Sequence, residues 1–213
     1  MRTLFTSQYR AVLVSVIGVI ATGLALVVVM NIQGVSERTI AASLLILSFM
    51  VFGVGGVLFT GRAFLKWQIG ETSSHLIWER SFVIGGILFT VLGLALLEDM
   101  LHAAGEPALS RLGMLAYLFG AVIAVIAETT YLAKHDWVYP QIVLYVVLAF
   151  LAQAAFGASL LQTGLVAGWV GWVTIIWNLA WLSVLIVFSR RNIYFPALHH
   201  AAPLLIGIAL LVG

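Results

Sequence analysis

Charged side chains are scarce in this sequence: Asp, Glu, Lys and Arg make up only 8% of its 213 residues. Soluble domains carry about 25% charged residues, and a chain with so few cannot cover a water-facing globule with polar groups. Hydrophobic residues account for 63%, and the mean hydropathy is +1.14. These proportions exclude a soluble enzyme, a nucleic-acid-binding protein and a disordered chain. They predict a polytopic membrane protein surrounded by lipid.

Cysteine is absent, which excludes disulfides, thiolate metal sites and cysteine catalysis. The formal net charge is only +2, and the basic residues are dispersed, so no polyanionic partner is indicated. No spacing of residues indicates a metal or cofactor site, and we expect neither.

Seven segments contain the roughly 20 apolar residues that a helix needs to cross the hydrocarbon core of a membrane. They are residues 11–32, 39–60, 81–101, 112–133, 141–161, 169–189 and 197–213. The first is longer than the roughly 7–15 apolar residues of a secretory leader, so we expect an anchor. The longest connection, Gly61–Arg80, is too short for a soluble domain. The sequence therefore predicts an all-α bundle of seven transmembrane helices, forming a single domain over residues 1–213.

Basic residues are divided unequally between the two sides that alternate connections define. One side collects eight, namely Arg2, Arg10, Arg62, Lys66, Arg80, Lys134, Arg190 and Arg191. The other side collects Arg38 and Arg111. Short cytoplasmic loops carry the excess of Lys and Arg in membrane proteins. We therefore expect a cytoplasmic N-terminus and a C-terminus on the outside.

Glu128 is the acidic residue expected to lie deepest inside a span, five residues before the end of segment 112–133. A stripe of small residues with a spacing of three or four precedes it, comprising Gly113, Ala116, Gly120, Ala124 and Ala127. Such a stripe lets a neighbouring helix approach closely, and Glu128 continues the same face, so its side chain should point into the bundle. The candidate cations for it are Lys134, Arg190, Arg191, His199 and His200. Without a cation, Glu128 would be free to exchange a proton with cytoplasmic water.

Further polar side chains could converge with Glu128. Asn178 and Trp181 share one face of segment 169–189, and Tyr145 and Gln153 share one face of segment 141–161. The hypothesised ligand-binding pocket, in the cytoplasmic half, comprises Glu128, Tyr145, Gln153, Asn178, Trp181 and His199. The alternative is that these groups link helices by hydrogen bonds worth about 0.6–2 kcal/mol each. All histidines are expected in loops or near helix ends, with His199 and His200 as interfacial anchors, which argues against a b-type cytochrome.

Two family resemblances are present. Residues 156–158, 169–172 and 194–196 resemble small uncharacterised prokaryotic multi-pass membrane proteins, which implies the inner membrane of a prokaryote and no particular activity. The pairs His75/Glu79 and Asn178/Trp181, together with Glu128, resemble the H-x3-E, Glu and N-x2-W pattern of the sterol-isomerase (emopamil-binding) family. That likeness implies an enzyme acting on a lipid or isoprenoid, with Glu128 as acid or base. The family has five spans, however, and His75 and Glu79 are expected here in a loop.

Three classes of function remain open. A structural or accessory membrane subunit is favoured, because nothing catalytic is evident and every connection is short. The alternatives are a small transporter or ligand-binding protein using the pocket around Glu128, and a membrane-embedded lipid enzyme. We expect membrane lipids as partners, with further copies of the chain or other membrane subunits beside them.

Overall fold

The computed structural model describes residues 7–66, 72–134, 138–188 and 195–213, and this part of the chain is helical and contains no strand. The helices are α1 (Ser7–Ile32), α2 (Glu37–Thr60), α3 (Thr72–Ala103), α4 (Leu109–Lys134), α5 (Tyr139–Thr163), α6 (Gly168–Phe188), α7 (Phe195–Leu198) and α8 (Ala201–Val212). A π-helical segment, η1 (Gly61–Leu65), continues α2. The prediction of an all-α bundle is confirmed.

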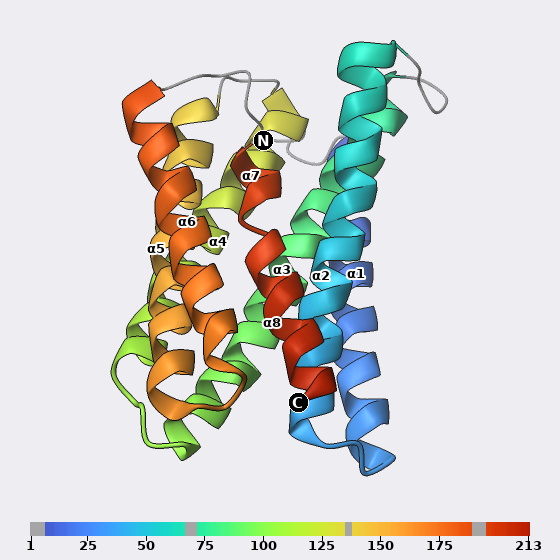
Figure 1. Ribbon diagram of the computed structural model, residues 1–213. Helices are drawn as coiled ribbons and strands as arrows, with labels where there is room; N and C mark the ends of the chain where they lie inside the picture. Colours follow the sequence, from blue (N-terminus) through green and yellow to red (C-terminus); the bar gives the residue numbers. More distant parts are fainter. Residues whose placement is uncertain (1–6, 67–71, 135–137, 189–194) are drawn as a thin grey trace.

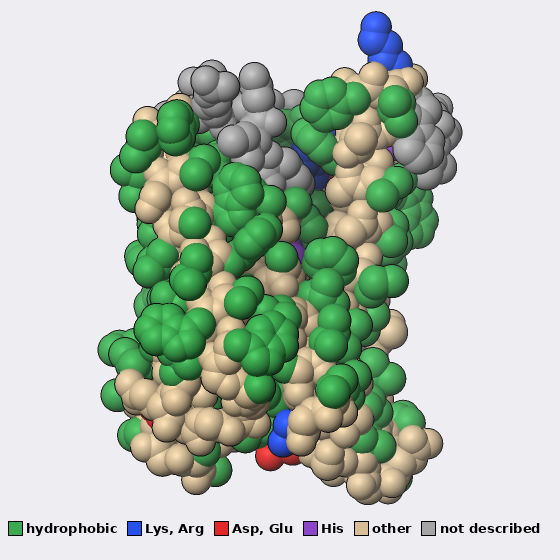
Figure 2. All heavy atoms as spheres, in the orientation of Figure 1, with side chains coloured by type: hydrophobic (Ala, Val, Ile, Leu, Met, Phe, Trp, Pro, Cys, Tyr) green, Lys and Arg blue, Asp and Glu red, His purple; other side chains and the backbone are tan. Residues whose placement is uncertain are grey.

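Six helical segments in the described residues are long and apolar enough to cross a membrane, when α7 and α8 are taken together as Phe195–Val212. Within α1, Ile20–Ile32 is a shorter apolar helix. Hydrophobic side chains cover the flanks of the bundle, and charged side chains gather towards its two ends on the visible face (Figure 2). These features are those of a multi-pass membrane protein.

Successive long helices run in opposite directions, and the last span, α7 and α8, lies between α2 and α6 (Figure 1). The most extensive contacts join α2 to α3, α4 to α5, and α5 to α6. Helix α8 packs mainly against α2 and much less against α6. The last span is therefore held firmly on one side and loosely on the other.

The small-residue stripe of α4 faces α5, as predicted. A Cβ atom at Gly113 would lie 2.9 Å from the carbonyl oxygen of Ala152, and one at Gly120 would lie 3.2 Å from the Tyr145 ring. Ala124 and Ala127 are buried. These positions let the two helix backbones approach closely.

Helix α4 begins at a side-chain cap supplied by Glu106. The Glu106 carboxylate accepts hydrogen bonds from the backbone N–H groups of Ala108, Leu109 and Ser110, at 2.7–3.0 Å. Burial raises the pKa of Glu106, but these bonds and the Ser159 side chain outweigh it and lower the pKa to about 2. The first-turn donors of α4 are thus satisfied by a carboxylate, which the helix dipole also favours.

The connection predicted over Gly61–Arg80 is wrong in extent. Helix α3 begins at Thr72, and η1 extends α2 to Leu65, so His75 and Glu79 lie on a helix. Both are completely buried. Hydropathy misplaces this boundary because it scores each charged residue separately. It therefore takes no account of the ion pairs between Arg62, Glu79 and Arg80, which allow these side chains to be buried.

The last span is interrupted where the sequence analysis expects a continuous helix. Helix α7 ends at Leu198 and α8 begins at Ala201. Pro203 lacks an N–H group, and its ring crowds the carbonyl of the residue four positions earlier, which is His199. His199 and His200 occupy the break and are completely buried, so their predicted role as interfacial anchors is wrong.

Candidate functional site

A cluster of polar side chains surrounds the break between α7 and α8; we call it the central cluster. Its members are Thr90 on α3, Tyr117 on α4, Tyr145 and Gln153 on α5, and His199 and His200. Each is buried, with at most 1% of its surface exposed. Thr90 lies midway along α3 and Gln153 midway along α5, so the central cluster occupies the middle of the bundle.

His199 is the centre of a hydrogen-bonded chain. Its Nε2 atom lies 2.6 Å from the hydroxyl of Tyr145, and its Nδ1 atom lies 3.3 Å from the amide nitrogen of Gln153. The tautomer of His199 decides which of its ring nitrogens donates and which accepts. The Tyr145 hydroxyl lies 3.4 Å from that of Tyr117. The chain thus links α4, α5 and the last span.

His200 stacks beside His199 and faces the other half of the bundle. The two ring centroids are 4.1 Å apart. The centroid of the Phe52 ring, on α2, lies 4.0 Å from that of His200. The Nδ1 atom of His200 lies 3.4 Å from the hydroxyl of Thr90. Because both histidines belong to one segment, they do not form the facing pair that a bis-histidine haem requires.

Four buried polar atoms at the central cluster and beside it have no hydrogen-bond partner within the described part of the chain. They are Gln153 Oε1, His200 Nε2, Thr174 Oγ1 and Asn178 Oδ1. The last two lie on the inner face of α6, where a Cβ atom at Gly157 of α5 would lie 3.1 Å from Thr174. A buried polar group without a partner costs about 1–3 kcal/mol. These four atoms are hydrogen-bonding groups that the described part of the chain leaves without a partner.

Glu128 belongs to a separate network of ion pairs. Arg80 donates from Nη1 to both carboxylate oxygens of Glu128, at 2.9 and 3.1 Å, and its Nη2 atom lies 3.0 Å from Glu79. Arg62 donates to both oxygens of Glu79, at 2.7 and 3.0 Å. Glu128 is 4% exposed, so its predicted inward orientation is confirmed.

Within the described part of the chain, the cation that pairs with Glu128 is Arg80, which was not among the five candidates. Arg190 and Arg191 lie outside the described residues. Hydropathy predicts Arg80 in a loop, whereas α3 begins eight residues earlier, at Thr72. Arg80 therefore lies on a helix that packs against α4.

The structure separates the hypothesised pocket into parts. Tyr145, Gln153 and His199 come together in the central cluster. Glu128 follows Tyr117 by eleven residues on α4, about 16 Å of helix rise, and lies with Arg80 towards one end of the bundle. Asn178 donates to the carbonyl oxygen of Thr174 on its own helix, at 2.7 Å.

Three residues of the central cluster were missed from the sequence: Thr90, Tyr117 and His200. Tyr117 lies three residues before Gly120, on the small-residue face of α4, and this spacing could have identified it. For His200 the available signal was Pro203, which predicts a break in a membrane span. Thr90 carries no signal of its own, because it lies in a long apolar run.

The constellation that resembles the sterol-isomerase family is not assembled into one site. His75 lies 3.0 Å from the carbonyl oxygen of Leu58 and 3.9 Å from Glu79. Glu79 and Glu128 are both paired with arginine, whereas Asn178 lies on the inner face of α6. Either carboxylate would have to leave its arginine before acting as an acid or base. Among the described residues, no group of three His, Asp or Glu side chains is placed to hold a metal.

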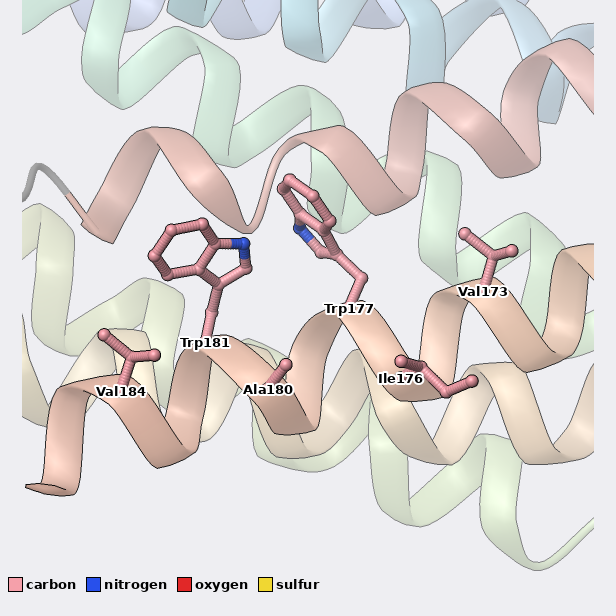
Figure 3. A pocket seen from close by; sticks show the side chains of 6 residues that line it. All are labelled: Val173, Ile176, Trp177, Ala180, Trp181 and Val184. Carbon is pink, nitrogen blue, oxygen red and sulfur yellow. The ribbon is translucent and has the colours of Figure 1, made fainter.

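A groove of about 380 Å³ runs along the lipid-facing side of α6, beside the break in the last span (Figure 3). Its lining residues are Val173, Ile176, Trp177, Ala180, Trp181 and Val184. Trp177 and Trp181 lie edge to face, with centroids 5.8 Å apart. The Trp177 indole donates to the carbonyl oxygen of Leu198 at 2.8 Å, which satisfies an acceptor at the end of α7.

No family profile, curated protein or solved structure matches this chain.

Proposed function

We propose that this protein binds a small molecule at the central cluster, as a small transporter or a membrane-embedded binding protein. The observation that carries the proposal is the set of four buried polar atoms without partners around an interrupted helix. Ionisable residues inside a membrane bundle are costly and mark functional sites by default. Transporters place such sites near the middle of the membrane, where spanning helices are discontinuous.

The donor and acceptor groups of the cluster suit a neutral ligand. The described members are hydroxyl, amide and imidazole groups, with no carboxylate, guanidinium or ammonium among them. The ion pairs of Arg62, Glu79, Arg80 and Glu128 satisfy one another in the other network. The four buried atoms without partners at the central cluster and beside it are the groups there that a neutral ligand could bind.

A structural or accessory subunit is the second candidate, and the Arg62–Glu79–Arg80–Glu128 network favours it. This network joins η1, α3 and α4, and ion pairs between helices hold the helices in one arrangement. On that hypothesis the central cluster would serve the same purpose, and every member would contribute to stability.

Replacing Asn178 with Leu separates the two functions. The substitution removes the unpartnered Oδ1 atom and one hydrogen bond within α6, so we expect the Tm to stay within about 2 °C or rise, since removing an unsatisfied polar atom is nearly neutral or stabilising. Native mass spectrometry of protein purified gently from its membrane should show a bound small molecule on the wild type and its loss from Asn178→Leu. Asn31→Leu, at an exposed position on α1, is the matched control and should keep it.

Tyr145→Phe provides the opposite reference. It removes the 2.6 Å bond to His199, and we expect it to lower the free energy of unfolding by about 0.5–1.5 kcal/mol. An Asn178→Leu protein that loses stability as Tyr145→Phe does, and keeps any bound molecule, would contradict ligand binding at the cluster and support the structural role.

A further inference from the structure

We infer that the ligand is a neutral amphiphile with a hydroxyl head and an apolar chain, which enters the central cluster from the lipid between α6 and the last span. This inference rests on the proposed function and specifies its ligand class and its route.

The head-group chemistry follows from the atoms without partners. Gln153 Oε1 and Asn178 Oδ1 are carbonyl oxygens, which only accept hydrogen bonds, and both are buried without a donor in the described part of the chain. Thr174 Oγ1 and His200 Nε2 can act in either role. A head group that donates is therefore needed, and a head group that only accepts would leave both carbonyls unsatisfied. The absence of a carboxylate from the described members of the cluster favours an alcohol over an ammonium group.

The route follows from the position of the groove. Trp181 lines the groove and follows Asn178 by three residues, so the two side chains leave α6 on the same side of the helix. The Trp177 and Trp181 rings extend towards the break between α7 and α8 (Figure 3). Trp177 is bonded to Leu198, the residue before His199. The groove is lined by α6 alone, and the hydrogen bond of Trp177 places it beside the segment that carries the buried histidines.

The boundary between α6 and the last span is also suited to opening. Helix α8 packs closely against α2, where a Cβ atom at Gly207 would lie 2.9 Å from the carbonyl oxygen of Ala42, and far less against α6. The volume of about 380 Å³ falls within the roughly 300–1,000 Å³ of ligand sites. Its lining is aliphatic and indole carbon, as a hydrocarbon chain requires.

The test uses hexadecan-1-ol bearing a mid-chain diazirine, and the methyl ether of the same compound, with the purified protein in lipid nanodiscs. After irradiation, we expect the alcohol to label the groove residues of α6 saturably. Excess hexadecan-1-ol should compete, and the ether should label about three- to tenfold less, the value of one or more lost hydrogen bonds. Asn178→Leu should remove this preference for the alcohol.

Ala180→Trp fills the groove and should lower saturable labelling at least tenfold. Leu179→Trp is the control: it places the same side chain on the adjacent, lipid-exposed residue, which does not line the groove, and labelling should stay unchanged. If Ala180→Trp shows no cooperative unfolding transition, Val184→Trp is the second variant that fills the groove.

Equal labelling by alcohol and ether would overturn the inference, since the groove would then hold only bulk lipid chains. A bound molecule that survives Ala180→Trp in native mass spectrometry would also overturn it. Both results leave the proposed function standing with a different ligand or route. If native mass spectrometry finds no bound small molecule on the wild-type protein, that result would instead count against the proposed function.

Discussion

Arg80 is the residue that connects the charged end of the bundle. It contacts Glu79 on its own helix and Glu128 on α4, and its guanidinium lies 4.9 Å from the Tyr131 ring. Its side chain is only 12% exposed. A buried charge is tolerated only when it is paired and hydrogen-bonded, so Arg80 depends on both carboxylates.

Glu128→Gln should therefore destabilise the protein. The change keeps the shape of the side chain and removes the charge that Arg80 contacts, while Glu79 still pairs with Arg80. We expect a loss of about 1.5–3 kcal/mol in the free energy of unfolding, the range of a hydrogen bond to a charged group. Unfolding in mixed micelles with increasing SDS measures it.

Asp99→Asn is the control for this substitution, because Asp99 is exposed near the end of α3. The free energy of unfolding of the Asp99→Asn protein should equal that of the wild type. A Glu128→Gln protein as stable as the wild type would show that the ion pair with Arg80 contributes nothing measurable. That result would favour the hypothesis that Glu128 exchanges a proton with water.

The residues of the candidate site could be predicted in part. Tyr145 and Gln153 were predicted to share one face of their helix, His199 was expected near a helix end, and the structure joins all three by hydrogen bonds. The partner of Glu128 could not be found in this way, because whether Arg80 is in a loop or on a helix depends on charges that only tertiary contacts neutralise. Helical periodicity predicts which face a residue lies on, but not its height relative to a neighbouring helix.

At the scale of the helices, α2 and α3 form the pair with the most extensive contacts, and glycines let them approach closely. A Cβ atom at Gly86 would lie 2.6 Å from Cβ and 3.0 Å from Cα of Phe52. Gly55 and Gly93 are similarly close to the facing helix, at 3.0 and 2.7 Å. Small residues of this kind replace the hydrophobic effect as the means of helix association in lipid.

Gly86→Ala should push these two helices apart. The added methyl group meets backbone and not the end of a flexible side chain, so we expect a loss of about 1–3 kcal/mol by overpacking. Gly53→Ala, on the same α2 helix, is the matched control because nothing lies within 4 Å of its Cβ position. It should leave stability unchanged or raise it by up to about 1 kcal/mol, since Ala favours helix over Gly. SDS-induced unfolding should therefore show a loss of stability for Gly86→Ala and none for Gly53→Ala, and equal shifts would contradict the close packing.

The helices themselves were the most predictable elements, because a run of about 20 apolar residues has few alternatives in a membrane. Their ends were less predictable. The N-terminal ten residues of α3 contain Glu79 and Arg80, and a composition-based boundary excludes them until their partners are known. The interruption of the last span has a local cause in Pro203, yet proline is tolerated within many membrane helices, so the residue alone did not determine the break.

At the scale of the whole molecule, the chain crosses from one end of the bundle to the other with each long helix, and α8 ends at the end opposite to that where α1 begins (Figure 1). Arg38, at the start of α2, donates to the carbonyl oxygen of Leu210 at 2.8 Å. This bond ties the C-terminal turn to the same end of the bundle as the turn between α1 and α2. Arg62, Lys66 and Arg80 lie towards the other end.

The charge distribution then makes a prediction about orientation in the membrane. The alternation of the predicted connections assigns eight of the ten basic residues to the side of the connection between α2 and α3, and an excess of Lys and Arg in short connections is retained in the cytoplasm. Alkaline phosphatase fused after Gly213 should therefore be active in the periplasm, and so should a fusion at Gly164, which lies at the same end. A fusion within residues 67–71 should be inactive, and green fluorescent protein at that position should fluoresce.

Activity at Gly164 without activity after Gly213 would contradict a last span that crosses the membrane despite its break at His199 and His200. The reverse pattern at all three positions would contradict the orientation, because it would place eight basic residues on the outer side.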